Sequence, residues 1–173
     1  MSVKDFVQQR RDALIAMRRD FHMYPEPAWL EYRSAAKVAD RLISLGYDVA
    51  LGADVLDLDS RMGLPSDEVM KAGMDRAIKE GANPELVEKM GYGKTAIVAT
   101  MKFGGESPVV AFRVDMDSND VIEAKEDSHV PTKKGFRSCH DKAMHACGHD
   151  AHMTMGLGLA EYLAAHKDEF KGT

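Results

Sequence analysis

Apolar and polar positions follow helical and strand periods along most of the chain. Apolar residues recur among charged ones over residues 3–21 and predict an amphipathic helix, which the prolines just after it would end. A second helical pattern covers residues 31–45, and Gly46 follows it as a typical C-cap. Residues 47–51 then predict a short strand. The first quarter of the chain is thus expected to be helix, helix and strand.

Residues 52–92 have the pattern of an insertion between strands rather than of core. Ser66 precedes one helical pattern, and Asn83 precedes a second whose first helical position is Pro84. Serine and asparagine are good N-caps, and proline fits the first helical position. We therefore expect two short helices on the surface here.

Two β-rich segments follow, residues 95–101 and 109–114, with glycine and proline between them. They predict a hairpin or adjacent strands. The second is nearly all apolar, as in a strand buried on both faces, and it leads directly into Asp115 and Asp117. A carboxylate pair at the carboxyl end of a buried strand is where open α/β sheets place their ligands.

A last helical pattern covers residues 153–166. Gly156 and Gly158 weaken it by about 1 kcal/mol each, so we expect them to allow close packing against the sheet. Helices that alternate with two or three strands predict an α/β fold.

Composition narrows the class of protein. A chain of 173 residues with 45% hydrophobic and 29% charged residues is typical of one soluble globular domain. The net charge of −5, with no basic block, argues against nucleic acid and anionic membranes as partners. The sequence contains no signal-peptide pattern and no apolar run long enough to cross a bilayer, so we expect a cytoplasmic protein.

The candidate chemistry is concentrated in residues 139–152, which hold both cysteines and four of the seven histidines. Cys147 and His149 flank a glycine that lets the backbone turn tightly, so their side chains can converge on one ion. Thiolate and imidazole bind zinc at about 2.3 Å and 2.0–2.1 Å. Asp115 and Asp117 could add an oxygen ligand or orient an imidazole.

The residues alone leave two kinds of metal site open. A closed structural zinc site would use Cys139, His140 or His145, Cys147 and His149, although the adjacent residues 139 and 140 converge poorly on one ion. An open catalytic site would take its remaining ligands from elsewhere, and the nearby carboxylates and glycines favour it.

The other histidines and the two thiols have simpler expected roles. For His22, His129 and His166 we expect core packing or an ordinary surface position. A disulfide between Cys139 and Cys147 is disfavoured in a reducing compartment.

Several motifs resemble one enzyme family. Ala111-Phe-Arg-Val-Asp-Met-Asp117 and Met144-His-Ala-Cys-Gly-His-Asp-Ala-His152 resemble the amidohydrolase branch of the aminoacylase and carboxypeptidase G metallopeptidase superfamily, which includes hippurate and auxin-conjugate hydrolases. Residues 18–26 resemble the opening segment of that branch. Residues 45–47, 60–65 and 135–139 extend the similarity to its two-subunit p-aminobenzoyl-glutamate hydrolases, nearly end to end.

The resemblance implies a fold and a metal centre. Residues 1–173 would be the N-terminal portion of a catalytic domain, a three-layer sandwich with helices around a mixed sheet, which also carries a smaller lid domain for dimerisation. The centre would hold two divalent metal ions, manganese or zinc. Cys147 and His149 would be ligands, and Asp117 the aspartate that assists the metal site in catalysis. Supporting residues around them would be Asp115 (where many relatives have a ligand histidine), His145, Asp150 and His152.

The catalytic base of this family is the first of two consecutive glutamates, and the chain contains no such pair. We expect it and the remaining ligands beyond Thr173, so the 173 residues alone should be inactive. The implied substrate is an N-acyl amino acid, first p-aminobenzoyl-glutamate, a folate breakdown product. The implied partner is a related subunit in a homo- or hetero-oligomer. The alternatives are a non-catalytic module with structural zinc and a degenerate partner subunit.

Overall fold

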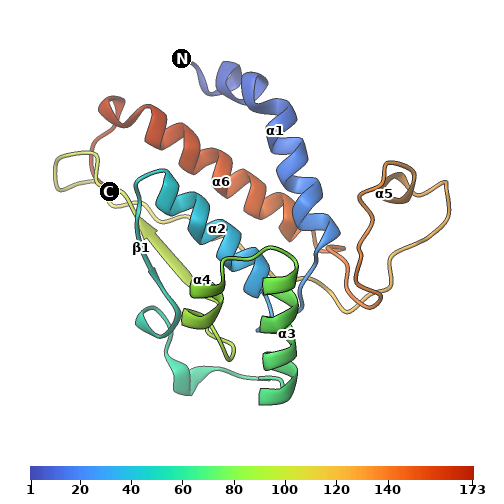
Figure 1. Cartoon of the computed structure of the whole chain (residues 1–173). Coiled ribbons are helices and arrows are strands. Elements are labelled where there is room, and N and C mark those ends of the chain that lie inside the picture. The colour runs from blue at the N-terminus through green and yellow to red at the C-terminus, as the bar shows by residue number, and fades with distance from the viewer.

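Helices and one small sheet make up the chain in the computed structural model, which describes residues 1–173 (Figure 1). In chain order the elements are α1 (Val3–Met23), α2 (Tyr32–Ser44), β1 (Asp48–Leu51), α3 (Asp67–Lys79), α4 (Pro84–Lys89), β2 (Ile97–Thr100), α5 (Val130–Lys133) and α6 (His149–Ala165), with short 3-10 turns at Gly52–Asp54, Leu58–Ser60 and Lys167–Glu169. None of the helices is long and apolar enough to cross a membrane.

The helices within residues 52–92 begin where the sequence predicts, because the capping residues act as expected. The Ser66 hydroxyl accepts the N–H of Val69 at the start of α3 (3.4 Å). The Asn83 side chain accepts the N–H of Glu85 at the start of α4 (3.1 Å). Both predicted helices are therefore confirmed.

The prediction that these helices lie outside the core is wrong. Met70 and Met74 of α3 and Val87 of α4 are buried. The alanines of α2 present a surface of small side chains, and the long, flexible methionines and branched residues of α3 and α4 fill the space against it. The largest core cluster comprises Tyr32, Ala35, Ala36, Ala39, Met74, Ala77, Ala82, Leu86, Val87 and Met90.

The sheet has two antiparallel strands, in which Asp48 pairs with Thr100 and Leu51 with Ile97. The predicted strand at residues 109–114 does not form. No other strand lies beside this segment to complete a hydrogen-bonded ladder, and its first residues are uncovered, with Val109 74% exposed. The apolar pattern shows that side chains of this segment need to be buried, and residues 1–173 do not bury them.

Helix α6 packs along α1 (Figure 1). A Cβ on Gly158 would lie 3.2 Å from Leu14 of α1, and one on Gly156 would lie 2.7 Å from the side chain of Val114. The glycines therefore do allow close packing, but Gly158 packs against a helix rather than the sheet.

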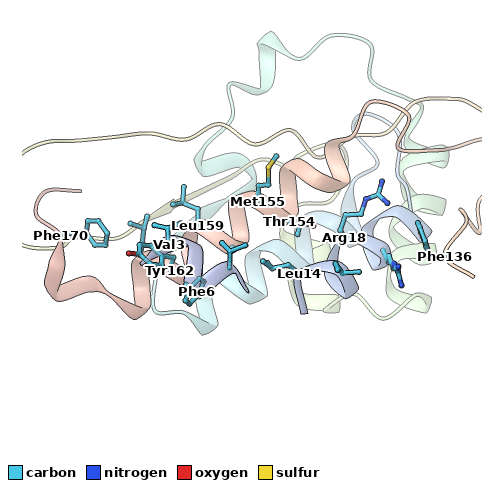
Figure 2. Close-up of a pocket in the computed structure, with 15 residues that line it drawn as sticks. Val3, Phe6, Leu14, Arg18, Phe136, Thr154, Met155, Leu159, Tyr162 and Phe170 are labelled. Carbon is cyan, nitrogen blue, oxygen red and sulfur yellow. The ribbon is translucent and has the colours of Figure 1, made fainter. Parts of the chain in front are cut away.

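An apolar groove with a volume of about 860 Å³ follows α1 and α6, from Val3 and Phe170 at one end to Arg18 and Phe136 at the other (Figure 2). Arg18 extends from this end of the groove to the buried carboxylate of Asp150, whose Oδ2 lies 2.9 Å from its Nε.

A buried carboxylate caps α2. Glu26 is fully buried, and its two oxygens accept the backbone N–H groups of Arg33 (3.0 Å) and Ser34 (2.8 Å) in the first turn of the helix. Arg76 of α3 lies 3.3 Å from the same carboxylate. Glu26 therefore joins the start of α2 to α3.

We predict that Glu26→Ala lowers the free energy of unfolding by about 3–5 kcal/mol, because it leaves two buried N–H groups and an arginine without their partner. Urea denaturation measures this value. Glu88→Ala on the exposed face of α4 is the control and should stay within about 0.5 kcal/mol of the wild type. Equal stability of the two variants would contradict the capping role.

Candidate metal centre

The cysteine-glycine-histidine motif forms the entry to α6. Gly148 has a φ of +82°, a left-handed conformation that favours glycine, and α6 begins at the next residue. Cys147 therefore lies just before the helix, with His149 in its first turn and His152 one turn later. The two imidazole rings stack, with centroids 5.0 Å apart and an angle of 26° between the planes.

Asp117 contacts both residues that the sequence predicts as metal ligands. His149 Nδ1 lies 3.0 Å from the Asp117 carbonyl oxygen and 2.9 Å from Asp117 Oδ1. The thiol of Cys147 donates to the same carbonyl oxygen (3.6 Å). Because a carbonyl only accepts, the imidazole proton belongs on Nδ1, and Nε2 keeps a lone pair. A carboxylate bonded to one ring nitrogen is how proteins orient an imidazole whose other nitrogen binds a metal.

Asp115 lies close to His152. One of its carboxylate oxygens accepts from Arg113 Nε (3.1 Å), and the other lies 3.6 Å from His152 Nδ1. Asp115, His149 and His152 each offer a ligand atom, and these three atoms lie within 4.8 Å of one another. The geometry thus brings a carboxylate and two imidazoles together beside Cys147.

His145 is the buried histidine of the motif. Burial lowers its pKa to about 4, so the ring is neutral at pH 7. Its Nε2 is buried and has no hydrogen-bond partner, and its Nδ1 lies 4.0 Å from the sulfur of Cys147. A neutral imidazole with an unpartnered buried nitrogen, next to a thiol, fits the surroundings of a divalent cation. The residues present are therefore suited to a metal ion.

A chain of buried charged groups lies beneath the motif. Asp150, fully buried in the first turn of α6, lies 2.7 Å from His22 Nδ1 and 2.9 Å from Arg18 Nε. The other ring nitrogen of His22 lies 2.9 Å from Glu123, which also contacts His129 (2.8 Å). This Asp150–His22–Glu123 chain joins the start of α6 to the end of α1 and to the loop before α5.

The pKa shifts show how these groups are charged. Burial would lower the pKa of His22, but its hydrogen bonds to Asp150 and Glu123 outweigh burial and raise the pKa above its usual 6.5. Burial would raise the pKa of both carboxyls, yet the hydrogen bond from His22 and the charges around them lower the pKa of each. An imidazolium held between two carboxylates is thus the favoured state near neutral pH.

The structure places the predicted residues in two positions. Asp115, His149 and His152 form one group, and Asp117 contacts both His149 and Cys147, whereas Asp150 contacts His22. The four residues of the closed zinc site do not gather, because Cys139 and His140 lie with Glu80 in a separate group. Both cysteines are free thiols.

Sequence reasoning missed the roles of His22 and Glu123. His22 belongs to the segment 18–26 that resembles the opening of the family, so a signal was present. Glu123 is one charged residue in an irregular polar segment, and nothing in the sequence marks it. Its role depends on contacts more than 100 residues away, as its separation from His22 shows.

Comparisons with known proteins link the chain to metallopeptidases. Residues 111–173 match the model of Peptidase family M20/M25/M40. The chain is 44% identical over 171 residues to a p-aminobenzoyl-glutamate hydrolase subunit from Escherichia coli K12, covering 99% of this chain and 39% of that protein. It is 42% identical over 170 residues to the indole-3-acetyl-aspartic acid hydrolase of Enterobacter agglomerans, covering 98% of this chain and 39% of that protein.

Solved structures agree with these sequence matches. The aminobenzoyl-glutamate utilization protein of Klebsiella pneumoniae aligns with a TM-score of 0.80 and 35% identity, over 99% of this chain and 37% of that one. A dinuclear metal binding peptidase of the M20 family from Bacillus subtilis aligns with a TM-score of 0.60 and 25% identity, over 98% and 34%.

These matches confirm the resemblance and the α/β fold class that the motifs predict. The chain spans about 39% of the length of the two curated relatives. Strands β1 and β2 therefore correspond to only part of the fold of these longer relatives.

We predict that His22→Gln removes a pH-dependent part of the stability. The pKa of His22 is higher in the folded protein than in the unfolded chain, where it is about 6.5. The protonated ring therefore contributes its full stabilisation below pH 6.5, and this contribution is lost as the pH rises through the pKa of the folded protein. Urea denaturation from pH 5 to 9 in the presence of a chelator should show this decline for the wild type only. At pH 6 the variant should be about 3–5 kcal/mol less stable.

His166→Gln, at the other end of α6, is the control and should keep the wild-type pH profile. If the His22→Gln profile parallels the wild type across the whole range, His22 does not hold a proton between the two carboxylates.

Proposed function

We propose that this chain is the N-terminal portion, residues 1–173, of the catalytic domain of a metal-dependent amidohydrolase. The observation that carries the proposal is the contact of His149 with Asp117. It fixes the proton on Nδ1 and leaves Nε2 available, while Cys147 faces the same Asp117 carbonyl. The match of residues 111–173 to the M20/M25/M40 peptidases supports it.

The centre would hold two divalent metal ions, manganese or zinc, with Cys147 and His149 as ligands. The Bacillus subtilis relative is a dinuclear metal binding peptidase, which supports two ions. Thiolate and imidazole are ligands that favour zinc and related metals. When bound, such ions lower the pKa of water and polarise an amide carbonyl.

The surrounding residues would hold the two ligands in place. Asp117 orients the His149 ring through its hydrogen bond to Nδ1. Its part in catalysis would be to hold this ligand in position. Asp115 and His152 face the same point, where they complete the polar lining of the site. His145 lies behind Cys147, and Asp150 anchors the first turn of α6 through His22.

The substrate that we propose is an N-acyl amino acid, first p-aminobenzoyl-glutamate, cleaved to p-aminobenzoate and glutamate in folate catabolism. The names of both curated relatives describe an aromatic acyl group joined by an amide bond to an acidic amino acid. We also propose that the chain works with a related partner chain, since the Escherichia coli relative is named as one subunit of its hydrolase.

The proposed domain organisation accounts for the uncovered apolar segment. Val109 and Phe112 are 74% and 66% exposed, and they lead into Asp115 and Asp117. In a complete catalytic domain, further strands of the same sheet would cover these residues. The remaining ligands, the catalytic glutamate and the lid domain would also belong to that complete domain. Residues 52–92 would be a helical insertion in that domain.

We predict that the enzyme containing residues 1–173 releases p-aminobenzoate from p-aminobenzoyl-glutamate and loses this activity on chelation. His149→Ala should lower kcat/KM at least about 100-fold, because the ion it binds supplies several kcal/mol to the transition state. His166→Ala is the matched control and should keep full activity. Hydrolysis that survives both chelation and His149→Ala would contradict the proposal.

The same assay with and without a related partner chain separates an active chain from a degenerate partner. Activity that belongs to the partner alone, and that His149→Ala leaves unchanged, would give this chain a supporting role only.

We predict that Asp117→Asn weakens metal binding about 10–100-fold, because the amide orients His149 less firmly than a carboxylate does. Isothermal titration calorimetry with zinc measures the affinity of each protein for the metal. Asp120→Asn, which lies nearby in the same loop, is the control and should bind zinc like the wild type. Unchanged affinity in Asp117→Asn would show that the contact with His149 has no part in metal binding.

A further inference from the structure

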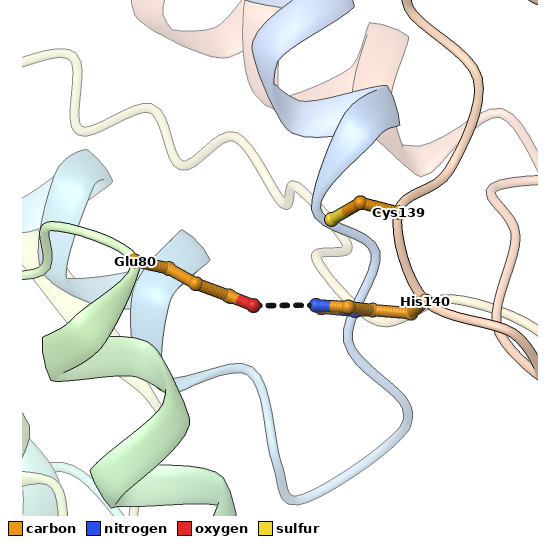
Figure 3. Close-up of side chains that lie close together, drawn as sticks. All are labelled: Glu80, Cys139 and His140. Carbon is orange, nitrogen blue, oxygen red and sulfur yellow. Dashed lines mark hydrogen bonds and ion pairs between the residues drawn. The ribbon is translucent and has the colours of Figure 1, made fainter.

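A second group of metal-binding side chains lies away from the motif. It consists of Glu80, the C-cap of α3, together with Cys139 and His140 in the loop before α6 (Figure 3). Each residue offers one ligand atom, and the three atoms lie within 4.8 Å of one another. Figure 3 shows both loop side chains leaving the backbone on the side that faces Glu80. No residue is shared with the candidate centre at Cys147 and His149.

His140 is held with one ring nitrogen pointing to Glu80. Its Nδ1 lies 2.7 Å from the carbonyl oxygen of Pro25, which can only accept a hydrogen bond. The imidazole proton therefore belongs on Nδ1, and the lone pair of Nε2 faces Glu80 Oε1 at 2.8 Å. A lone pair and a carboxylate oxygen repel each other at this distance unless a proton or a cation lies between them.

The Glu80 carboxylate supplies a second, independent observation. Its other oxygen, Oε2, is buried and has no hydrogen-bond partner. Arg76 Nε is also unpartnered and lies 3.9 Å away, too far for a hydrogen bond. The Arg76 guanidinium also lies 3.3 Å from Glu26, so its charge is shared between two carboxylates. One buried oxygen of Glu80 thus points into the group without a hydrogen bond, with Arg76 only at ion-pair distance.

Cys139 is fixed at the backbone and open at the sulfur. Its N–H donates to the Met23 carbonyl (2.9 Å), while the residue itself is exposed. No hydrogen bond joins its thiol to His140 or Glu80, although ligand atoms of both lie close to the sulfur. A cysteine without a basic partner is not an activated nucleophile. A carboxylate oxygen and an imidazole nitrogen close to the sulfur instead fit a set of metal ligands.

The adjacency of residues 139 and 140 is overcome by a bend in the loop. The Ser138 hydroxyl accepts the N–H of His140 (3.1 Å) and donates to the His140 carbonyl (2.9 Å). The Ser138 N–H in turn donates to Glu123 (2.5 Å). These bonds fold the loop back on itself, so two neighbouring side chains can point to the same side.

We propose that Glu80, Cys139 and His140 bind one zinc ion, with water as a fourth ligand. A carboxylate oxygen, a thiolate sulfur and an imidazole nitrogen are the ligands zinc takes in proteins, at about 2.0–2.3 Å. Binding would release the thiol proton to solvent as the Zn–S bond forms. Tetrahedral geometry requires ligand atoms about 3.3–3.6 Å apart, which small rotations of these side chains provide. The ion would tie the end of α3 to the loop that leads into α6.

The test uses the complete chain with Cys147→Ser, which leaves Cys139 as the only thiol of residues 1–173. Cobalt(II) is the probe, because thiolate coordination gives an intense near-ultraviolet charge-transfer band. We expect one equivalent of cobalt to produce the band, zinc to remove it, and either metal to raise the melting temperature. Adding Glu80→Gln should weaken binding at least about tenfold, while Glu88→Gln should not change it.

Some results of this experiment would support the proposed site, and others would contradict it. Loss of the band on adding Cys139→Ser, or weaker binding and a smaller melting shift in the Glu80→Gln protein, supports the site. A protein that gives the band only while Cys147 is present has no site at Cys139, and the proposal is then wrong. It is equally wrong if Glu80→Gln and Glu88→Gln bind cobalt alike.

Discussion

The contact between Asp150 and His22 holds the metal-binding motif in place. Asp150 lies directly after His149 and has no exposed surface, so its carboxylate must be matched by buried positive charge. His22 and Arg18 on the last turns of α1 supply that charge at 2.7 and 2.9 Å. Since Glu123 contacts the other ring nitrogen of the same imidazole, one buried residue fixes the position of α6 relative to α1 and to the loop beyond the carboxylate pair.

The candidate centre depends on this fixed helix. Once the first turn of α6 is anchored, His149 meets the carbonyl and carboxylate oxygens of Asp117, and Cys147 faces the carbonyl of the same residue. The proton of His149 is then held on Nδ1 and its Nε2 remains available. The chemistry that we propose for the site rests on this order: a buried ion pair positions the helix, the helix positions the ligands, and a carboxylate orients one of them.

Local features of the fold were predictable and long-range ones were not. Five of the six α-helices, the caps at Ser66 and Asn83 and the turn at Gly148 follow from nearest-neighbour chemistry, and the structure confirms them, whereas the short α5 was not predicted. The apolar pattern of residues 109–114 predicts a buried strand, but such a pattern shows only that the side chains need to be buried and not which part of the protein buries them. Glu123 was missed because its role arises only when the fold brings it to His22. The group at Glu80 was hidden for the same reason, since Glu80 and His140 are 60 positions apart.

The most direct test of the proposed centre is a crystal structure of the metal-loaded enzyme, with anomalous diffraction recorded at the zinc or manganese edge. We expect an ion about 2.3 Å from Cys147 Sγ and about 2.1 Å from His149 Nε2, with Asp117 still bonded to Nδ1 of the same ring. An ion bound through Nδ1 of His149, or no ion within reach of Cys147 and His149, would contradict the proposed centre.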